Sequence, residues 1–130
     1  MKRKILYIED NDQNYYLVSF ILNAQGHTVT RARDGREGID LATREHPDLI
    51  LLDIQLPVMD GYATARELRR IPGVAATPIV ALTSYAMAGD REKALEAGCT
   101  GYIEKPINPK TFTEQIKNYF PAGEATGGGG

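Results

Sequence analysis

Short apolar runs alternate along the chain with longer segments in which apolar residues recur at helical spacing. The runs that predict strands cover residues 4–9, 27–32, 48–53, 78–84 and 100–106. The segments that predict helices cover residues 11–26, 36–46, 62–71, 90–98 and 110–120. Strands and helices that alternate in this way form a parallel sheet with helices on both faces. We therefore predict an α/β fold, a flavodoxin-like (βα)5 doubly wound parallel sheet with strand order 2-1-3-4-5.

For two of these segments the sequence also indicates how their apolar residues are placed. Residues 48–53 are continuously apolar between two aspartates, which indicates a strand that is buried on both faces at the centre of the sheet. The first helix has apolar residues spaced as one helical face. That face comprises Tyr16, Leu17, Phe20 and Ile21.

Length and composition narrow the class of protein. The 130 residues fit one domain, and we expect it to span residues 1–120, followed by a flexible Gly-rich tail over residues 121–130. The net charge of −2 provides no excess of positive charge for DNA or RNA, so direct nucleic-acid binding is not expected. No apolar run approaches the roughly 20 residues that cross a bilayer, and the single Cys99 suits a reducing compartment. These features predict a cytoplasmic protein with no membrane partner.

Polar side chains gather where the predicted strands end. In a parallel sheet the carboxyl ends of the strands share one edge, and ligands bind there at the point where the strand order reverses. The residues that the predicted topology brings to this edge are Glu9, Asp10, Asp53, Thr83, Ser84 and Lys105. A strand as apolar as residues 48–53 therefore ends in Asp53 because the carboxylate projects into a polar site.

Three neighbouring carboxylates repel one another and need a positive charge to offset them. Lys105 supplies one such charge, and a hard divalent cation bound through oxygen, namely Mg²⁺ with several waters, supplies the rest. An aspartate can attack phosphorus and form an acyl phosphate, so Asp53 is a candidate nucleophile. Lys105 and the Thr83 hydroxyl would then bind the new phosphoryl group.

The motifs "ILYIEDN", "PDLILLDIQLPVMDG", "PIVALTSYA" and "AGCTGYIEKPI" resemble those of the receiver domain of two-component response regulators. The resemblance extends from Lys4 to about Phe120. It implies a (βα)5 switch that accepts a phosphoryl group from a histidine kinase or a histidine phosphotransfer protein. It also implies output through contacts with an effector protein on the face formed by the fourth helix, the fifth strand and the fifth helix.

The resemblance assigns roles to single residues. Asp53 matches the phosphoacceptor, Thr83 the switch hydroxyl and Lys105 the phosphate-binding lysine. Tyr102 matches the aromatic that reorients on activation, although it could equally be a packed aromatic. The metal ligands that the resemblance implies are Glu9, Asp10, Asp53 and the backbone carbonyl of Gln55, with Asp10 as a direct ligand. The Lys105-Pro106 bond resembles one that is cis in the family.

The chain departs from the family pattern near the expected phosphoryl group. Glu9 stands where many members have aspartate, and its longer side chain is expected to act through water. Gln55 and Tyr85 each lie two residues after a site residue, at positions that influence the lifetime of the phosphoryl group in the family. A bulky Tyr85 could restrict the attacking water, so we expect a long-lived phosphorylated state.

Three other classes of protein were weighed against this interpretation. A phosphohydrolase with an aspartate nucleophile would need a general acid near Asp53, and Gln55 cannot serve as one. A flavin or nucleotide domain would have a loop rich in Gly, Ser or Thr after the first strand, whereas residues 9–12 are "EDND". A receiver-like interaction module would have lost Asp53 or Lys105. The sequence leaves open whether the domain forms a phosphorylation-dependent dimer. It also leaves open whether the domain stands alone or belongs to a hybrid kinase.

Overall fold

The computed structural model describes residues 2–56, 58–83 and 89–120. The strands are β1 (Lys4–Ile8), β2 (Thr28–Ala32), β3 (Leu49–Asp53), β4 (Ile79–Thr83) and β5 (Gly101–Glu104). The helices are α1 (Asp12–Ala24), α2 (Gly35–Glu45), α3 (Gly61–Arg69), α4 (Asp90–Glu96) and α5 (Pro109–Lys117), with a 3-10 turn η1 at Pro72–Val74. Ser84, Tyr85 and the predicted tail lie outside the described residues.

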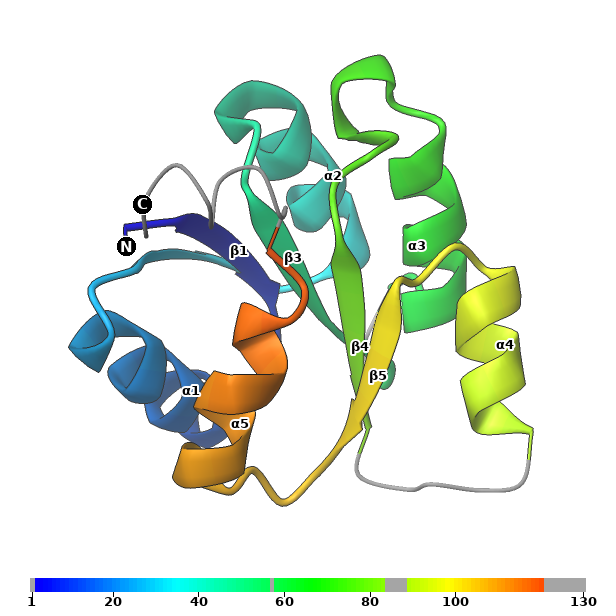
Figure 1. Cartoon of the computed structure of the whole chain (residues 1–130). Helices are drawn as coiled ribbons and strands as arrows, with labels where there is room; N and C mark the ends of the chain where they lie inside the picture. Colours follow the sequence, from blue (N-terminus) through cyan, green and yellow to red (C-terminus); the bar gives the residue numbers. More distant parts are fainter. Residues whose placement is uncertain (1, 57, 84–88, 121–130) are drawn as a thin grey trace.

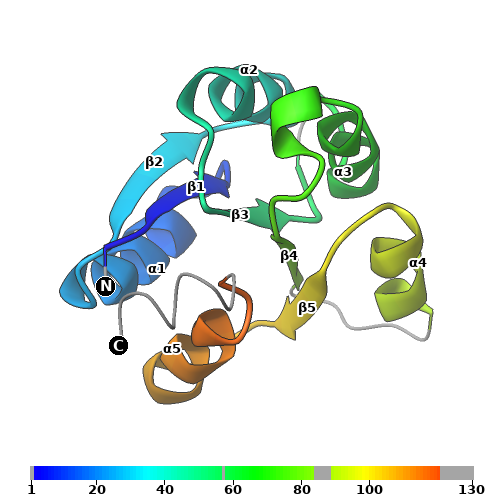
Figure 2. The ribbon, with the colours of Figure 1, turned by 45° about the horizontal axis from the view of Figure 1, so that its top comes forward.

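The five strands form one parallel sheet in the order β2-β1-β3-β4-β5, as predicted (Figure 1). Figure 2 shows α1 and α5 on one face of this sheet, and α2, α3 and α4 on the other. The order places β1 beside β3. The end of β1, which Glu9 and Asp10 follow, therefore lies next to the end of β3 at Asp53. The predicted edge position of residues 27–32 and the central position of residues 48–53 are both confirmed.

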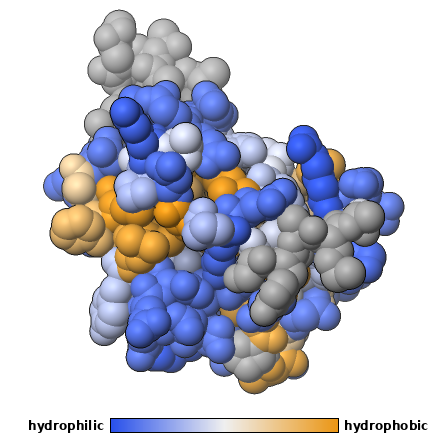
Figure 3. Space-filling view, turned by 90° about the horizontal axis from the view of Figure 1, so that it is seen from below, coloured by the Kyte–Doolittle hydropathy of each residue, from blue (hydrophilic) through white to orange (hydrophobic). Residues whose placement is uncertain are grey.

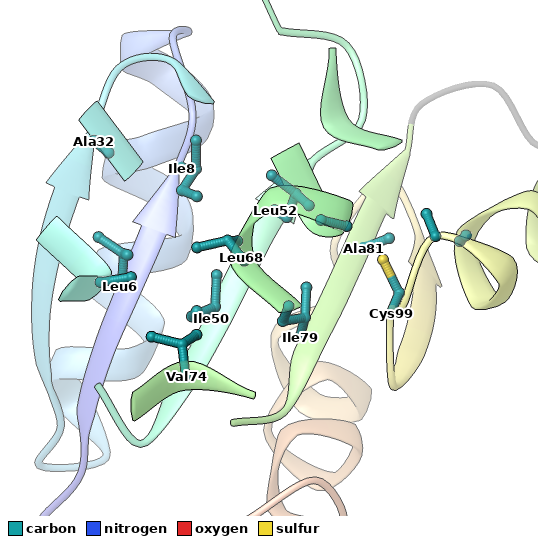
Figure 4. Close-up of a cluster of buried hydrophobic side chains, with 14 residues drawn as sticks. Leu6, Ile8, Ala32, Ile50, Leu52, Leu68, Val74, Ile79, Ala81 and Cys99 are labelled. Atoms are coloured by element: carbon teal, nitrogen blue, oxygen red, sulfur yellow. The ribbon is translucent and has the colours of Figure 1, made fainter. Parts of the chain in front are cut away.

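Two hydrophobic clusters hold the helices on the sheet, because successive strand residues point to opposite faces. Leu6 and Ile8 join the cluster beneath α2, α3 and α4, which Figure 4 shows with Cys99 at one side. Ile5 and Tyr7 join the cluster beneath α1 and α5. All residues of β3 are buried, as its continuous hydrophobicity predicted.

The predicted apolar face of the first helix is wrong in three of its four residues. Tyr16, Leu17 and Phe20 are 65%, 46% and 74% exposed, and Figure 3 shows a hydrophobic patch on the side of the molecule where α1 and α5 lie. The helix instead packs against the sheet through a neighbouring stripe, which comprises Val18, Ile21 and Leu22. The segment is apolar enough for two stripes at helical spacing, and docking on the sheet selects the aliphatic one.

Side-chain caps begin the helices close to the predicted positions. Asn11, Asp34, Asp60 and Asn108 each accept a hydrogen bond from a backbone N–H of the first helical turn. Pro109 is the first residue of the last helix, one residue before the predicted start. Several predicted elements end earlier in the structure by one to three residues, which is the usual uncertainty at element boundaries.

The last described residues pack against the beginnings of the first two strands. The ring of Phe120 lies 5.0 Å from the Arg3 guanidinium and 5.2 Å from the His27 ring. Arg3 precedes β1 and His27 precedes β2, so Phe120 lies at the amino end of the sheet. In the part of the chain that the structure describes, no helix is long and apolar enough to cross a membrane.

Candidate functional site

The ends of β1 and β3 bring three carboxylates together, as the strand order predicts. Glu9 and Asp10 follow β1, and Asp53 is the last residue of β3. Each offers an oxygen within 4.8 Å of the others. Glu9 and Asp53 are 0% and 5% exposed, whereas Asp10 is exposed to solvent. We call the site formed by Glu9, Asp10 and Asp53 the acidic pocket. Two of its carboxylates are buried, and the third, that of Asp10, is exposed to solvent at its mouth.

Burial and the interactions between the carboxylates shift the pKa values of Asp53 and Glu9 in opposite directions. The pKa of Asp53 is raised to about 7, first by burial and then by the hydrogen bond and the charge of Glu9. Burial alone would also raise the pKa of Glu9, but donors from Asp53, Lys105 and Tyr7 hold it below its usual value. Near neutral pH without a metal, Asp53 therefore holds a proton more readily than an ordinary aspartate, and Glu9 less readily than an ordinary glutamate.

Lys105 lies between the two buried carboxylates. Its Nζ is 3.1 Å from Oε1 of Glu9 and 3.7 Å from Oδ2 of Asp53. The backbone N–H of Lys105 donates to the carbonyl of Thr83 at 2.7 Å, which fixes the lysine beside the end of β4. The Lys105-Pro106 bond is cis, as the resemblance implied.

The other predicted residues surround this centre. Thr83 ends β4 and is buried, and the half-buried Tyr102 lies on the adjacent strand β5. The backbone N–H of Gln55 donates to Oδ1 of Asp53 at 3.0 Å. Gly61 begins α3 so close to this loop that a Cβ would lie 2.6 Å from the Cα of Ile54. The absence of a side chain at Gly61 therefore lets α3 begin close to the residue that follows Asp53.

Sequence reasoning missed one residue that contacts the pocket. Tyr7, in the middle of β1, is fully buried and donates its hydroxyl to Oε1 of Glu9 at 2.9 Å. Burial, followed by the charge of Glu9, raises the pKa of Tyr7, so the hydroxyl stays protonated and is the donor. A tyrosine at a buried position of an aliphatic strand was the available signal, because such a hydroxyl needs a partner.

The donor atoms of the pocket fit a hard divalent cation. Carboxylate oxygens are the ligands that Mg²⁺ prefers, and a site with one exposed carboxylate leaves room for its waters. Burial in this pocket raises the pKa of Asp53, and a bound cation would favour its ionised form. Asp10, Asp53 and the carbonyl of Gln55 are the candidates for direct contact, and Glu9 is the candidate for contact through water.

A model of the family described as the response regulator receiver domain matches residues 5–117. The chain belongs to this family. It is accordingly a signalling domain that phosphorylation operates, and the family that the motifs predicted is confirmed. Its fold agrees with that of solved receiver domains, including the strand order.

Individual relatives support this assignment. The chain is 40% identical over 120 residues to the polar-differentiation response regulator DivK of Brucella ovis, covering 92% of this chain and 98% of the relative. It is 36% identical to the receiver domain of the sensor histidine kinase PA1611 from Pseudomonas aeruginosa, with a TM-score of 0.85 and coverage of 92% and 98%. That receiver was crystallised with a magnesium ion in its active-site cleft. The Vibrio cholerae chemotaxis protein CheY4 is 29% identical, with a TM-score of 0.87 and coverage of 92% and 100%.

Proposed function

We propose that Asp53 is the phosphoacceptor of this receiver domain and that Mg²⁺ assists the transfer. The observation that carries the proposal is the position of Asp53. It ends a fully buried strand, contacts Lys105 and the Gln55 N–H, and lies within 4.8 Å of oxygens from both other carboxylates. No structural role of an aspartate needs this combination, since a buried carboxylate beside two others costs stability.

The reaction that this geometry supports is a phosphoryl transfer. An ionised Asp53 oxygen forms a bond to phosphorus while the bond from phosphorus to the donor's nitrogen or oxygen breaks, and the leaving group takes up a proton. A bound divalent cation screens the carboxylate from the incoming group and neutralises charge on the phosphoryl oxygens. Lys105 keeps its charge close to Asp53 and can contact a phosphoryl oxygen there. In this way the domain would catalyse its own phosphorylation and dephosphorylation.

Thr83 and Tyr102 are the proposed route from the site to a partner. Thr83 would bind the phosphoryl group, and its shift would then change the surroundings of Tyr102 on the adjacent strand. Tyr102 also lines a cavity of about 300 Å³ on the face of α4, β5 and α5, together with Arg91, Glu104, Ile107, Thr111 and Gln115. A hollow that contains the switch tyrosine is a suitable place for an effector protein, or for a second copy of the domain in a phosphorylation-dependent dimer.

The phosphodonor in this proposal is a histidine kinase or a histidine phosphotransfer protein. The cytoplasmic location and the boundary of the domain near residue 120 likewise remain predictions. They follow from the composition of the chain.

Intact mass after incubation with Mg²⁺ and acetyl phosphate tests the phosphoacceptor. We expect one added phosphoryl group, none in Asp53→Asn, and much slower formation when the metal is chelated. Asp40→Asn is the matched control, because Asp40 is an exposed aspartate on α2 far from the pocket in sequence. An adduct that persists in Asp53→Asn would show that another residue is the acceptor.

The lifetime of the phosphorylated state tests the proposed role of Tyr85, which lies outside the described residues. If its bulk restricts the attacking water, Tyr85→Ala should lose the phosphoryl group faster than the parent. The decay is followed by intact mass after the phosphodonor is removed. An unchanged decay rate would remove this role from the proposal.

A further inference from the structure

Tyr7 has a polar atom in a place where packing does not require one. It belongs to the buried cluster beneath α1 and α5, and it is the one member of that cluster whose side chain carries an oxygen or nitrogen. Burying a hydroxyl costs free energy unless it finds a hydrogen-bond partner. The partner of this hydroxyl is Oε1 of Glu9, at 2.9 Å.

The hydroxyl contributes to fixing both oxygens of Glu9. Oε1 accepts from Tyr7 and from the Lys105 ammonium, which is 3.1 Å away. Oε2 accepts from the backbone N–H of Asn11 at 3.3 Å. With Tyr7 present, the orientation of the carboxylate is therefore set by donors on two sides and does not depend on Lys105 alone.

The ring of Tyr7 is itself held in place from the side of α1. It stacks on Tyr15, with ring centroids 5.8 Å apart and an angle of 27° between the planes. The Arg31 guanidinium lies 4.7 Å from the centroid of the Tyr15 ring. Arg31 Nε also donates to the backbone carbonyl of Glu9 at 3.1 Å, and its NH1 pairs with Asp12 at 2.7 Å. The column of Tyr7, Tyr15 and Arg31 thus begins and ends at Glu9.

Open space next to the ring shows that packing alone does not hold Tyr7 and Lys105 in place. A cavity of about 120 Å³ separates α1 from the segment after β5, and its lining includes Tyr7, Leu17, Val18, Lys105 and Ile107. Tyr7 and Lys105 therefore depend, in addition to packing, on their hydrogen bonds to Oε1 of the fully buried Glu9.

We infer that Tyr7 is a positioning residue of the metal site: its hydroxyl holds the Glu9 carboxylate in the orientation that serves a divalent cation. This inference rests on the proposed function, since it assumes that Mg²⁺ binds beside Asp53. Residues that orient metal ligands commonly change metal affinity by about 10- to 100-fold when they are removed. Glu9 is expected to act through water, so the lower end of this range applies.

The test compares Tyr7→Phe with Tyr15→Phe. The first substitution removes the hydroxyl that contacts Glu9, and the second removes a hydroxyl from the adjacent ring, so both keep the aromatic stack. Mg²⁺ alone is titrated into metal-free protein, and binding is followed by backbone amide chemical shifts. We expect the Mg²⁺ dissociation constant to rise about tenfold in Tyr7→Phe and to stay within about twofold of the parent in Tyr15→Phe.

Phosphorylation kinetics give a second, independent measurement. With acetyl phosphate as the donor, Tyr7→Phe should need about tenfold more Mg²⁺ for half-maximal rate, while the rate at saturating Mg²⁺ stays close to that of the parent. A residue that only stabilised the fold would shift the unfolding midpoint and leave the Mg²⁺ dependence unchanged. That result would overturn the inference.

A double-mutant cycle shows whether Tyr7 acts through Glu9. In a Glu9→Ala background, Tyr7→Phe should cause no further loss of Mg²⁺ affinity, because the carboxylate that it orients is gone. The same tenfold loss in both backgrounds would contradict the inference. In the parent, the Tyr7 hydroxyl proton should remain hydrogen-bonded and visible by NMR at saturating Mg²⁺, and its disappearance would also count against the inference.

These outcomes separate the inference from the proposed function. If the parent forms the Asp53 adduct and Tyr7→Phe binds Mg²⁺ as the parent does, only the role of Tyr7 fails. If the parent neither binds Mg²⁺ nor forms the adduct, the proposed function fails.

Discussion

Each end of the sheet holds a partly buried cationic side chain, and the groups that surround the two cations differ in kind. At the amino end Arg69 donates to the Thr100 hydroxyl and to backbone carbonyls, which are those of Val74, Ala75, Thr77 and Gly98. At the carboxyl end Lys105 lies 3.1 Å and 3.7 Å from two carboxylates. Arg69 is thus surrounded by fixed dipoles, whereas Lys105 is surrounded by charges that can take up protons or bind another cation.

This contrast identifies the end of the sheet whose charge state can change. The acceptors of Arg69 do not titrate near neutral pH, and their hydrogen bonds join α3, η1 and the segments that precede β4 and β5. The partners of Lys105 respond to pH, to metal and to an incoming phosphoryl group. The amino end therefore acts as a scaffold, and the chemistry is confined to the other end.

The largest expected effect comes from removing the scaffold cation. Arg69→Met keeps much of the side-chain stem but leaves several carbonyls without their donor, so we expect the free energy of unfolding to fall by about 3 kcal/mol. The loss should be the same at about pH 6 and about pH 8, because no titrating group pairs with Arg69. Denaturant unfolding at the two pH values measures the loss of unfolding free energy and its dependence on pH. A loss that changes with pH would break the contrast between the ends.

Lys105→Met is the matched change at the carboxyl end. Its cost in the metal-free protein should depend on pH, reaching about 2 kcal/mol at about pH 8, where Glu9 and Asp53 need the charge most. The cost should shrink towards about pH 5, where Asp53 is protonated. The same denaturant experiment tests this prediction, with Arg69→Met as the control that lacks the pH dependence.

Asp53→Asn should make the metal-free protein more stable while it abolishes phosphorylation. Folding raises the pKa of Asp53 from 3.8 to about 7, so the native state holds this proton more tightly than the unfolded chain. The contribution of Asp53 to stability is therefore full below about pH 4 and is lost as the pH rises to about 7. At about pH 8 we expect Asp53→Asn to exceed the parent by about 1 kcal/mol, since the lowered pKa of Glu9 offsets part of the shift.

Unfolding midpoints of parent and variant across the pH range measure this effect. Saturating Mg²⁺ at about pH 8 should stabilise the parent more than Asp53→Asn, because the variant lacks one carboxylate ligand. A parent that is the more stable of the two at high pH without metal would contradict the prediction.

The smallest effect is expected at Cys99, beside the scaffold cation. The thiol is 5% exposed, and burial raises its pKa to about 11. At about pH 8 its reaction with a disulfide reagent should be at least about 100-fold slower in the folded protein than in denaturant. Absorbance of the released thiol measures the rate. Rapid modification of the folded protein would show that the amino end opens more readily than Arg69 suggests.

The strand order and the grouping of Glu9, Asp10, Asp53 and Lys105 could be predicted from the sequence. Both follow from local signals, because alternating strands and helices determine the layers and each strand end places its own last residue. The stripe of α1 that faces the sheet could not be predicted in this way. Two apolar stripes fit the same helix, and only contact with the sheet and α5 distinguishes Val18 from Phe20.

The contacts of Tyr7 and Arg69 also lay beyond the sequence. Each depends on which atoms meet after the chain has folded: a hydroxyl on β1 and a carboxylate two residues further along the chain, or a guanidinium and carbonyls up to 29 residues away. Composition and periodicity do not record such distances. The switch role of Thr83 and the roles of Tyr102 and Gln55 came from resemblance to receiver domains.

The packing of Phe120 against Arg3 and His27 fixes the position of the last residue that the structure describes. That point is at the amino end of the sheet, separated from Asp53 by the length of a five-residue strand, or about 16 Å. A fluorophore or a surface tether joined after Phe120 would therefore stand at the far pole of the molecule. Immobilised in this way, the protein would present its acidic notch outward to any phosphodonor in solution.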